Sequence, residues 1–143
     1  WLENCYNTIQ QHEGLLGTIG VIFKDLNYHG YHRFGWDNPN EKVEKVDIVG
    51  HSWFFKREWL GAYWREAALP LHYLSGEDIH FSYSIQKYLN LNTYVPPHPV
   101  NEPGLGWKYG VDSVGISCNF HGSHFGKNLQ HYKQKGFKFM ENL

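Results

Sequence analysis

Several features are scarce in this sequence, and each scarcity excludes a class of protein. Among 143 residues there are only two cysteines, Cys5 and Cys118. They are too few for a disulfide-rich scaffold and lack the spacing of a zinc knuckle, although a single disulfide between them stays open. No apolar run reaches the roughly 20 residues of a membrane span, and no signal segment opens the chain. We therefore expect no membrane span in this segment.

An excess of either charge is also lacking. The chain has 13 Lys and Arg against 14 Asp and Glu, which gives a formal charge of −1. Binding to a phosphate backbone needs a basic surface, so nucleic acid is not an expected partner. Aromatic residues are plentiful instead, with 6 Trp, 10 Tyr and 9 Phe. Most belong in a hydrophobic core, and the length fits a single domain over residues 1–143, since domains commonly have about 100–150 residues.

Hydrophobic periodicity and turn-forming residues predict alternating helices and strands, which is the pattern of an α/β fold. The predicted helices cover residues 2–14 and 56–67, a segment capped by Ser75 that runs to Leu89, and residues 124–135. The predicted strands cover residues 15–23, 43–49 and 91–95, and long surface segments are expected at 24–43 and 100–123.

The most informative local feature is the acidic pair Glu77-Asp78, which opens a predicted helix directly after Gly76. Acidic residues at a helix N-terminus are stabilised by the unpaired N–H groups and the helix dipole, so the pair can have a purely structural role. However, Asp78 falls in line with the apolar positions Phe81 and Ile85, at the rim of the expected core. A carboxylate in that position is a candidate general base.

Three segments together resemble the second half of GT-A glycosyltransferases of the family 2 type. They are VDIVGHSWFF at 46–55, GEDIHFS at 76–82 and YVPPHP at 94–99, within a resemblance that covers about residues 43–99. The resemblance implies a partial GT-A fold, with a mixed sheet flanked by helices. It also implies that Asp78 is the base that activates an acceptor hydroxyl and that Glu77 helps to bind the acceptor. Gly50, His51, Trp53 and Gly76 would then line the pocket for the donor sugar and acceptor.

The resemblance further implies inverting transfer from a nucleotide-diphospho-sugar donor to a glycan or another hydroxyl acceptor. In this family an aspartate-any-aspartate motif binds Mn²⁺ or Mg²⁺ and the diphosphate, and the chain contains no such motif. We therefore expect that the nucleotide-binding half lies upstream of Trp1 and that the isolated chain is inactive. His98, between Pro97 and Pro99, is the best positional match for an additional metal ligand, with His121 as the reserve, although a plain loop histidine is the favoured interpretation.

Two other functions compete with this interpretation. Ser52, Asp78 and His98 follow the order of an α/β-hydrolase triad, but Phe54 occupies the position where the nucleophile elbow needs a small residue. A non-catalytic carbohydrate-binding module that uses exposed Trp and Tyr side chains is the other alternative.

Overall fold

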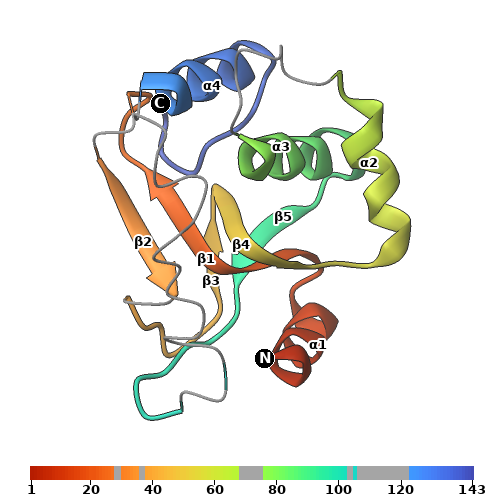
Figure 1. Cartoon of the computed structure of the whole chain (residues 1–143), viewed down its shortest axis with the longest axis vertical. Helices are drawn as coiled ribbons and strands as arrows, with labels where there is room; N and C mark the ends of the chain where they lie inside the picture. The colour runs from red at the N-terminus through yellow and green to blue at the C-terminus, as the bar shows by residue number, and fades with distance from the viewer. Residues whose placement is uncertain (28–29, 36–37, 68–75, 103–104, 106–122) are drawn as a thin grey trace.

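The computed structural model describes residues 1–27, 30–35, 38–67, 76–102, 105 and 123–143 (Figure 1). The chain forms an α/β fold in which helices flank a mixed, curled sheet, as the sequence predicts at this level. In chain order the elements are α1 (Leu2–Gln11), β1 (Gly14–Phe23), β2 (Tyr31–Gly35), β3 (Glu44–Val46), β4 (Ile48–Phe54), η1 (Arg57–Trp59), α2 (Leu60–Arg65), α3 (Glu77–Leu89), β5 (Asn92–Val95) and α4 (Ser123–Gln134). No helix among these is long and apolar enough to cross a membrane.

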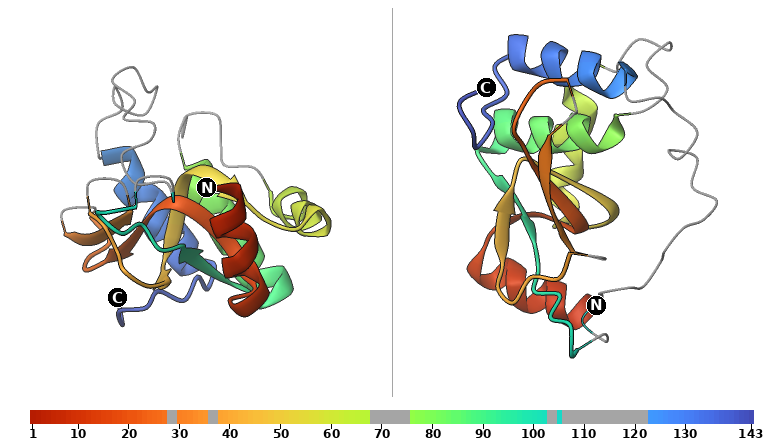
Figure 2. Two further views of the ribbon diagram at one scale, coloured as in Figure 1. Left: turned by 90° about the horizontal axis from the view of Figure 1, so that it is seen from below. Right: turned by 90° about the vertical axis from the view of Figure 1, so that its left-hand side faces the viewer.

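The sheet is organised around β1, which is almost entirely buried. This strand pairs antiparallel with β2 and β4 and parallel with β5, while β3 pairs antiparallel with β5. The continuous apolar run of β1 suits this central position, because a strand covered on both faces needs no polar alternation. Two views agree that α3 and α4 lie together at one end of the sheet and α1 at the other (Figures 1 and 2).

Helix α3 lies between two hydrophobic clusters and contributes to both. Phe81 and Ile85 belong to a cluster that includes residues of α1 and of the β1, β3, β4 and β5 strands. Ile79 and Tyr83 belong to a second cluster, formed with β1, β4, α4 and the segment after α4. Helix α3 is therefore held on two sides, which fixes the position of the residues at its N-terminus.

The structure corrects the predicted elements at three places. Residues 24–43 are not one loop, because Tyr31–Gly35 form the strand β2. The predicted strand over 43–49 is divided at Asp47, whose carboxylate accepts hydrogen bonds from the backbone N–H groups of Phe23 (2.7 Å) and Met140 (2.6 Å). Gly76 is the N-cap residue of α3, and Ser75 lies outside the described residues.

Glu66, at the C-terminal end of α2, connects three helical segments. Its carboxylate accepts hydrogen bonds from Lys87 Nζ (2.7 Å) and Tyr88 OH (2.9 Å) of α3 and also from Lys135 Nζ after α4. The side chain is only 4% exposed. Burial alone raises the pKa of Glu66, but the hydrogen bonds from Lys135, Lys87 and Tyr88 outweigh it and lower the pKa to about 2.

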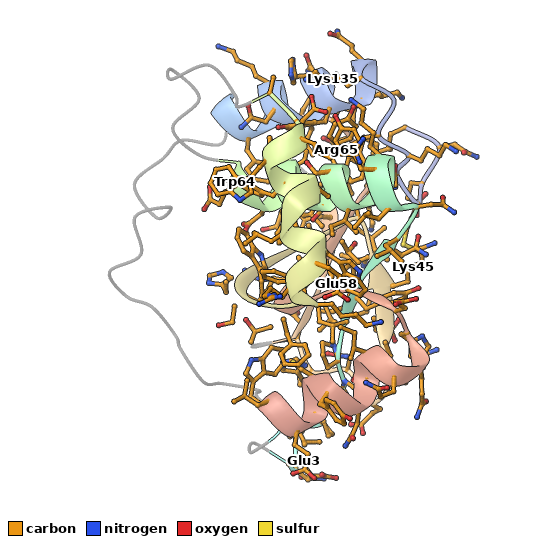
Figure 3. All side chains as sticks on the ribbon, turned by 90° about the vertical axis from the view of Figure 1, so that its right-hand side faces the viewer. Glu3, Lys45, Glu58, Trp64, Arg65 and Lys135 are labelled. Carbon is orange, nitrogen blue, oxygen red and sulfur yellow. The ribbon has the colours of Figure 1, made fainter. Side chains whose placement is uncertain are left out.

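We expect Glu66→Gln to lower the free energy of unfolding at pH 7 by about 1–3 kcal/mol, because charge-assisted hydrogen bonds are lost from a buried position. The contribution of the carboxylate is present above its unfolded pKa of 4.5 and is lost as the pH falls through about 2. The difference between the variants should therefore shrink on acidification. Urea unfolding at pH 7 and pH 3 measures it, with the exposed Glu58→Gln as the control (Figure 3). Equal losses of unfolding free energy in Glu66→Gln and Glu58→Gln would contradict the stabilising role of the Glu66 carboxylate.

Candidate functional site

The candidate site is at the N-terminus of α3. Gly76 caps the helix with a φ of 121°, a conformation that glycine adopts without steric cost. The exposed Glu77 accepts a hydrogen bond at Oε2 from the N–H of Gly76 (3.0 Å), which closes the first turn. Asp78 follows in the same turn and is partly buried. The local sequence thus directs one carboxylate outward and the other toward the sheet.

Strand β4 approaches Asp78 through Gly50. A Cβ atom added at Gly50 would lie 2.9 Å from Oδ2 of Asp78, closer than side chains normally allow. The absence of a side chain at this position therefore makes room for the carboxylate. The glycine and the acid predicted from separate segments of the sequence are in direct contact.

The Asp78 carboxylate borders a small pocket of about 90 Å³ between the sheet and the two helices α3 and α4. This volume is below the roughly 300–1,000 Å³ of typical small-molecule sites, so the pocket accommodates one end of a ligand. Its wall consists of Ile19, Gly20 and Val21 of β1, Tyr31 and Arg33 of β2, Ile48, Gly50 and His51 of β4, Asp78 of α3 and Phe125 of α4.

The surroundings of Asp78 favour its protonated form. Burial raises the pKa of this carboxyl group to about 7, and the charge of neighbouring Glu77 acts in the same direction. The pKa of Tyr63 on α2 is raised by burial and by the charges of Glu77 and Asp78, which places the phenol near both acids. A carboxylate that titrates near neutrality can accept a proton and then release it at physiological pH.

His51 has an unusual backbone conformation next to this pocket. Its φ of 68° lies in the left-handed region, which few residues other than glycine adopt. Such conformations cost about 1–3 kcal/mol and gather at functional sites. The strain at His51 is consistent with a binding role for the β4 strand here.

The structure brings together only part of the predicted site. Gly50, His51 and Asp78 line one pocket, whereas Trp53 and Gly76 do not line it. The Trp53 ring packs against Phe81, with centroids 5.4 Å apart, and its Nε1 donates a hydrogen bond to the carbonyl of Val49 (3.2 Å). Trp53 therefore supports the site from the core side, and Gly76 acts as the helix cap.

His98 lies elsewhere and does not line the Asp78 pocket. The side chain is fully buried, its Nδ1 is 2.6 Å from the carbonyl oxygen of Pro96, and its ring contacts Trp1 beside α1. Burial lowers its pKa, which favours the neutral ring. Its Nε2 has no hydrogen-bond partner among the described residues. These residues also contain no group of three or more His, Cys, Asp or Glu side chains that could hold a metal.

Seven of the ten pocket residues were not predicted as site residues, and three of them, Tyr31, Arg33 and Phe125, have a charged or aromatic side chain. Tyr31 and Arg33 fall in the segment interpreted as a loop, and Phe125 was assigned only to the last helix. The alternation of Tyr31 and Arg33 in β2 is a weak strand signal, too short to outweigh the surrounding glycines and asparagines. Strand pairing between β1 and β2 brings them to the site.

Comparison of the chain with protein-family models, with curated proteins and with solved structures finds no match. The functional interpretation of the candidate site therefore depends on the geometry of the site alone.

Proposed function

We propose that this chain is the acceptor-side half of a nucleotide-sugar-dependent glycosyltransferase of the GT-A type, with Asp78 as the general base. The observation that carries the proposal is the contact between Asp78 and Gly50, which holds a carboxylate with a pKa of about 7 at the edge of a pocket. This is the geometry and the pKa range that proton transfer from a hydroxyl group needs.

In the proposed reaction Asp78 removes the proton of the acceptor hydroxyl as its oxygen attacks the anomeric carbon of the donor sugar. The bond from that carbon to the diphosphate oxygen breaks on the opposite face, so the configuration is inverted. The proton ends on Asp78 and the bonding electron pair leaves with the nucleotide diphosphate. Glu77, exposed beside the base, is placed to accept hydrogen bonds from other acceptor hydroxyls.

Arg33 provides a positive charge on the β2 wall of the same pocket. Guanidinium groups bind phosphate oxygens in a bidentate manner. A cationic side chain on one wall and the general base Asp78 on another suit a reaction in which a hydroxyl is deprotonated and a phosphate departs.

A divalent cation, when bound, would neutralise the charge of the departing diphosphate. The described residues do not include a ligand set for it. The proposal assigns the cation mainly to other residues of the enzyme because the sequence lacks the aspartate-any-aspartate motif, and the part of Asp78 is to deprotonate the acceptor.

If Asp78 is the base, the rate of sugar transfer by the complete enzyme should rise with pH and level off, with an apparent pKa of about 7. An aspartate with the ordinary pKa of 3.8 would already be fully ionised over this range. The measurement is kcat/KM between pH 5.5 and 8.5 with a range of nucleotide-sugar donors and Mn²⁺. A flat profile for the wild type would contradict the role of Asp78, and absence of transfer with every donor would contradict the proposed function.

A non-catalytic carbohydrate-binding module is the second candidate, and Trp64 favours it. This side chain is 74% exposed on α2, projects away from the helix (Figure 3) and contacts Tyr63 with ring centroids 4.9 Å apart. Exposed aromatic rings can stack on sugars. Glycan binding that weakens in Trp64→Ala, without any turnover of a nucleotide sugar, would favour this alternative.

A further inference from the structure

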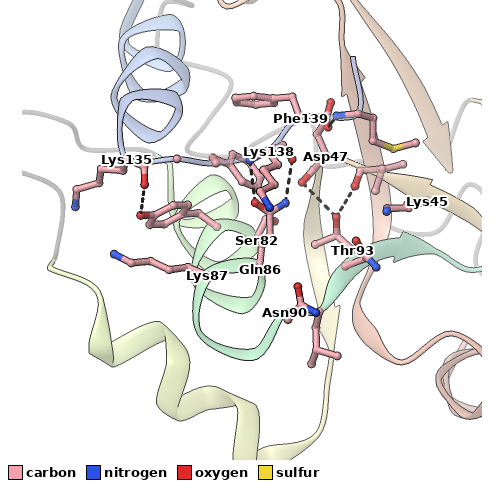
Figure 4. Close-up of a pocket in the computed structure, with 17 residues that line it drawn as sticks. Lys45, Asp47, Ser82, Gln86, Lys87, Asn90, Thr93, Lys135, Lys138 and Phe139 are labelled. Carbon is pink, nitrogen blue, oxygen red and sulfur yellow. Dashed lines mark hydrogen bonds between the residues drawn. The ribbon is translucent and has the colours of Figure 1, made fainter. Parts of the chain in front are cut away.

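A second cavity, of about 460 Å³, lies between the C-terminal half of α3, the start of β5 and the segment that follows α4 (Figure 4). It shares no lining residue with the Asp78 pocket. Its volume is within the range of small-molecule sites, about 300–1,000 Å³. The cavity is therefore large enough for a ligand and separate from the proposed site of transfer.

Four lysines line this cavity: Lys45, Lys87, Lys135 and Lys138. They come from three segments that are distant in sequence: β3, α3 and the segment after α4. Figure 4 shows Lys45 on one side of the cavity and Lys87 and Lys135 on the other. Because the whole chain has a formal charge of −1, four lysines around one cavity are a local concentration of positive charge.

The nearby acids compensate only part of this charge. Glu66 pairs with Lys87 and Lys135 together, so one carboxylate serves two cations. Asp47 is the acidic residue in the lining; its two oxygens accept backbone N–H groups, and its charge interacts with that of Lys45. Lys45 and Lys138 are exposed and form no hydrogen bond or ion pair with a described residue through their Nζ atoms. Even when the exposed Glu141 near Asp47 is counted, the lysines outnumber the acids.

Hydrogen bonds hold the walls of the cavity together. The side-chain amide of Gln86 donates to the carbonyl of Lys138 (2.9 Å) and accepts from its N–H (2.8 Å). Tyr83 OH donates to the carbonyl of Lys135 (3.0 Å), and Thr93 Oγ1 donates to the carbonyl of Val46 (2.6 Å). These polar groups are therefore satisfied within the protein, whereas the ammonium groups of Lys45 and Lys138, unlike those of Lys87 and Lys135, are available to a ligand.

We propose that this cavity binds a small ligand that carries a phosphate or sulfate group, held mainly by Lys45 and Lys138. Lysine ammonium groups act as point charges that pair well with tetrahedral oxyanions and do not need the planar geometry that arginine selects. Phe139, which is half-buried, also lines the cavity and offers an apolar surface to the body of such a ligand.

The test is titration of the protein with inorganic phosphate, inorganic sulfate, glucose 6-phosphate and uncharged glucose, followed by NMR shifts of the backbone amides. We expect saturable shifts at residues of the cavity with a Kd in the roughly millimolar range or below for the anions. The Lys45→Gln/Lys138→Gln variant should weaken binding at least about tenfold, since two charge-assisted contacts are lost. The matched control is Lys24→Gln/Lys127→Gln, which removes two exposed lysines elsewhere and should change the Kd by less than about twofold.

Glucose 6-phosphate that binds more tightly than inorganic phosphate would support the proposal and identify a sugar ester. Equal affinities would support it and identify the free anion. The proposal is overturned by non-saturable shifts, by glucose binding as tightly as glucose 6-phosphate, or by equal weakening in the control variant. The altered lysines are exposed and make no side-chain hydrogen bond with a described residue, so the variants should fold, which their amide spectra will verify directly.

Discussion

Asp78→Asn should lower the rate of sugar transfer by the complete enzyme about 10²–10⁴-fold, because asparagine cannot take up the proton of the acceptor. The fold should survive, since asparagine has nearly the same shape and suits a helix N-terminus. The folded pKa of Asp78, about 7, lies above its ordinary value of 3.8. The stabilising effect of this raised pKa is complete below pH 3.8 and is lost as the pH rises through about 7. Above that pH the variant should be at least as stable as the wild type.

Initial rates and thermal unfolding of Asp78→Asn and Ser52→Ala provide this test. Ser52 is exposed on β4 and does not line the Asp78 pocket, so Ser52→Ala should transfer sugar at close to the normal rate. A hydrolase with Ser52 as nucleophile requires the opposite result. An Asp78→Asn enzyme that unfolds at a lower temperature but transfers sugar at the normal rate would show that Asp78 has only a structural role.

Gly50→Ala should lower the transfer rate by up to about 10²-fold, although it adds only one methyl group. The new Cβ would lie 2.9 Å from Oδ2 of Asp78, so the carboxylate has to move. A displacement of about 1 Å in a reacting group can cost this factor. Strand β4 itself can remain, because alanine is compatible with the extended backbone of a strand. The expected result is a fall in kcat with a smaller change in stability.

Gly61→Ala is the matched control for this substitution. Gly61 is in α2, and a Cβ atom there meets nothing within 4 Å. Replacement of glycine by alanine inside a helix stabilises it by about 0.5–1 kcal/mol. The control should therefore be slightly more stable and equally active. If both variants lose activity alike, the effect does not come from the contact with Asp78.

Elements with strong periodicity were predicted correctly, whereas elements defined by long-range contacts were not. The apolar run before Phe23 and the stripe of α3 are local patterns, and both elements form where the sequence predicts them. Strand β2 was not predicted because it forms by pairing with β1, and a local sequence pattern contains no information about that pairing. The break at Asp47 depends on Met140, at the other end of the chain, so it could not be predicted locally.

In the candidate site, too, some features could be predicted from local sequence, whereas others depend on long-range contacts. The resemblance predicts Gly50 and Asp78 in one site, and these residues are in contact. The raised pKa of Asp78 requires burial by several elements, which a single sequence does not specify. Arg33 and Phe125 reach the pocket only through the folding of distant segments, so no local pattern identified them as site residues.

The parallel pairing of β1 with β5 also constrains how the chain reaches its native state. Gly14 pairs with Asn92, so β1 waits for a partner that is synthesised after α3. Closing so long a loop costs conformational entropy, and the β1–β5 contacts compensate for this cost only once they have formed. Until then one end of an apolar strand has an open edge, which is a template for intermolecular pairing. A nascent chain or truncated product that ends before β5 also lacks the partner of β3, and such a species is expected to depend on chaperones for its solubility.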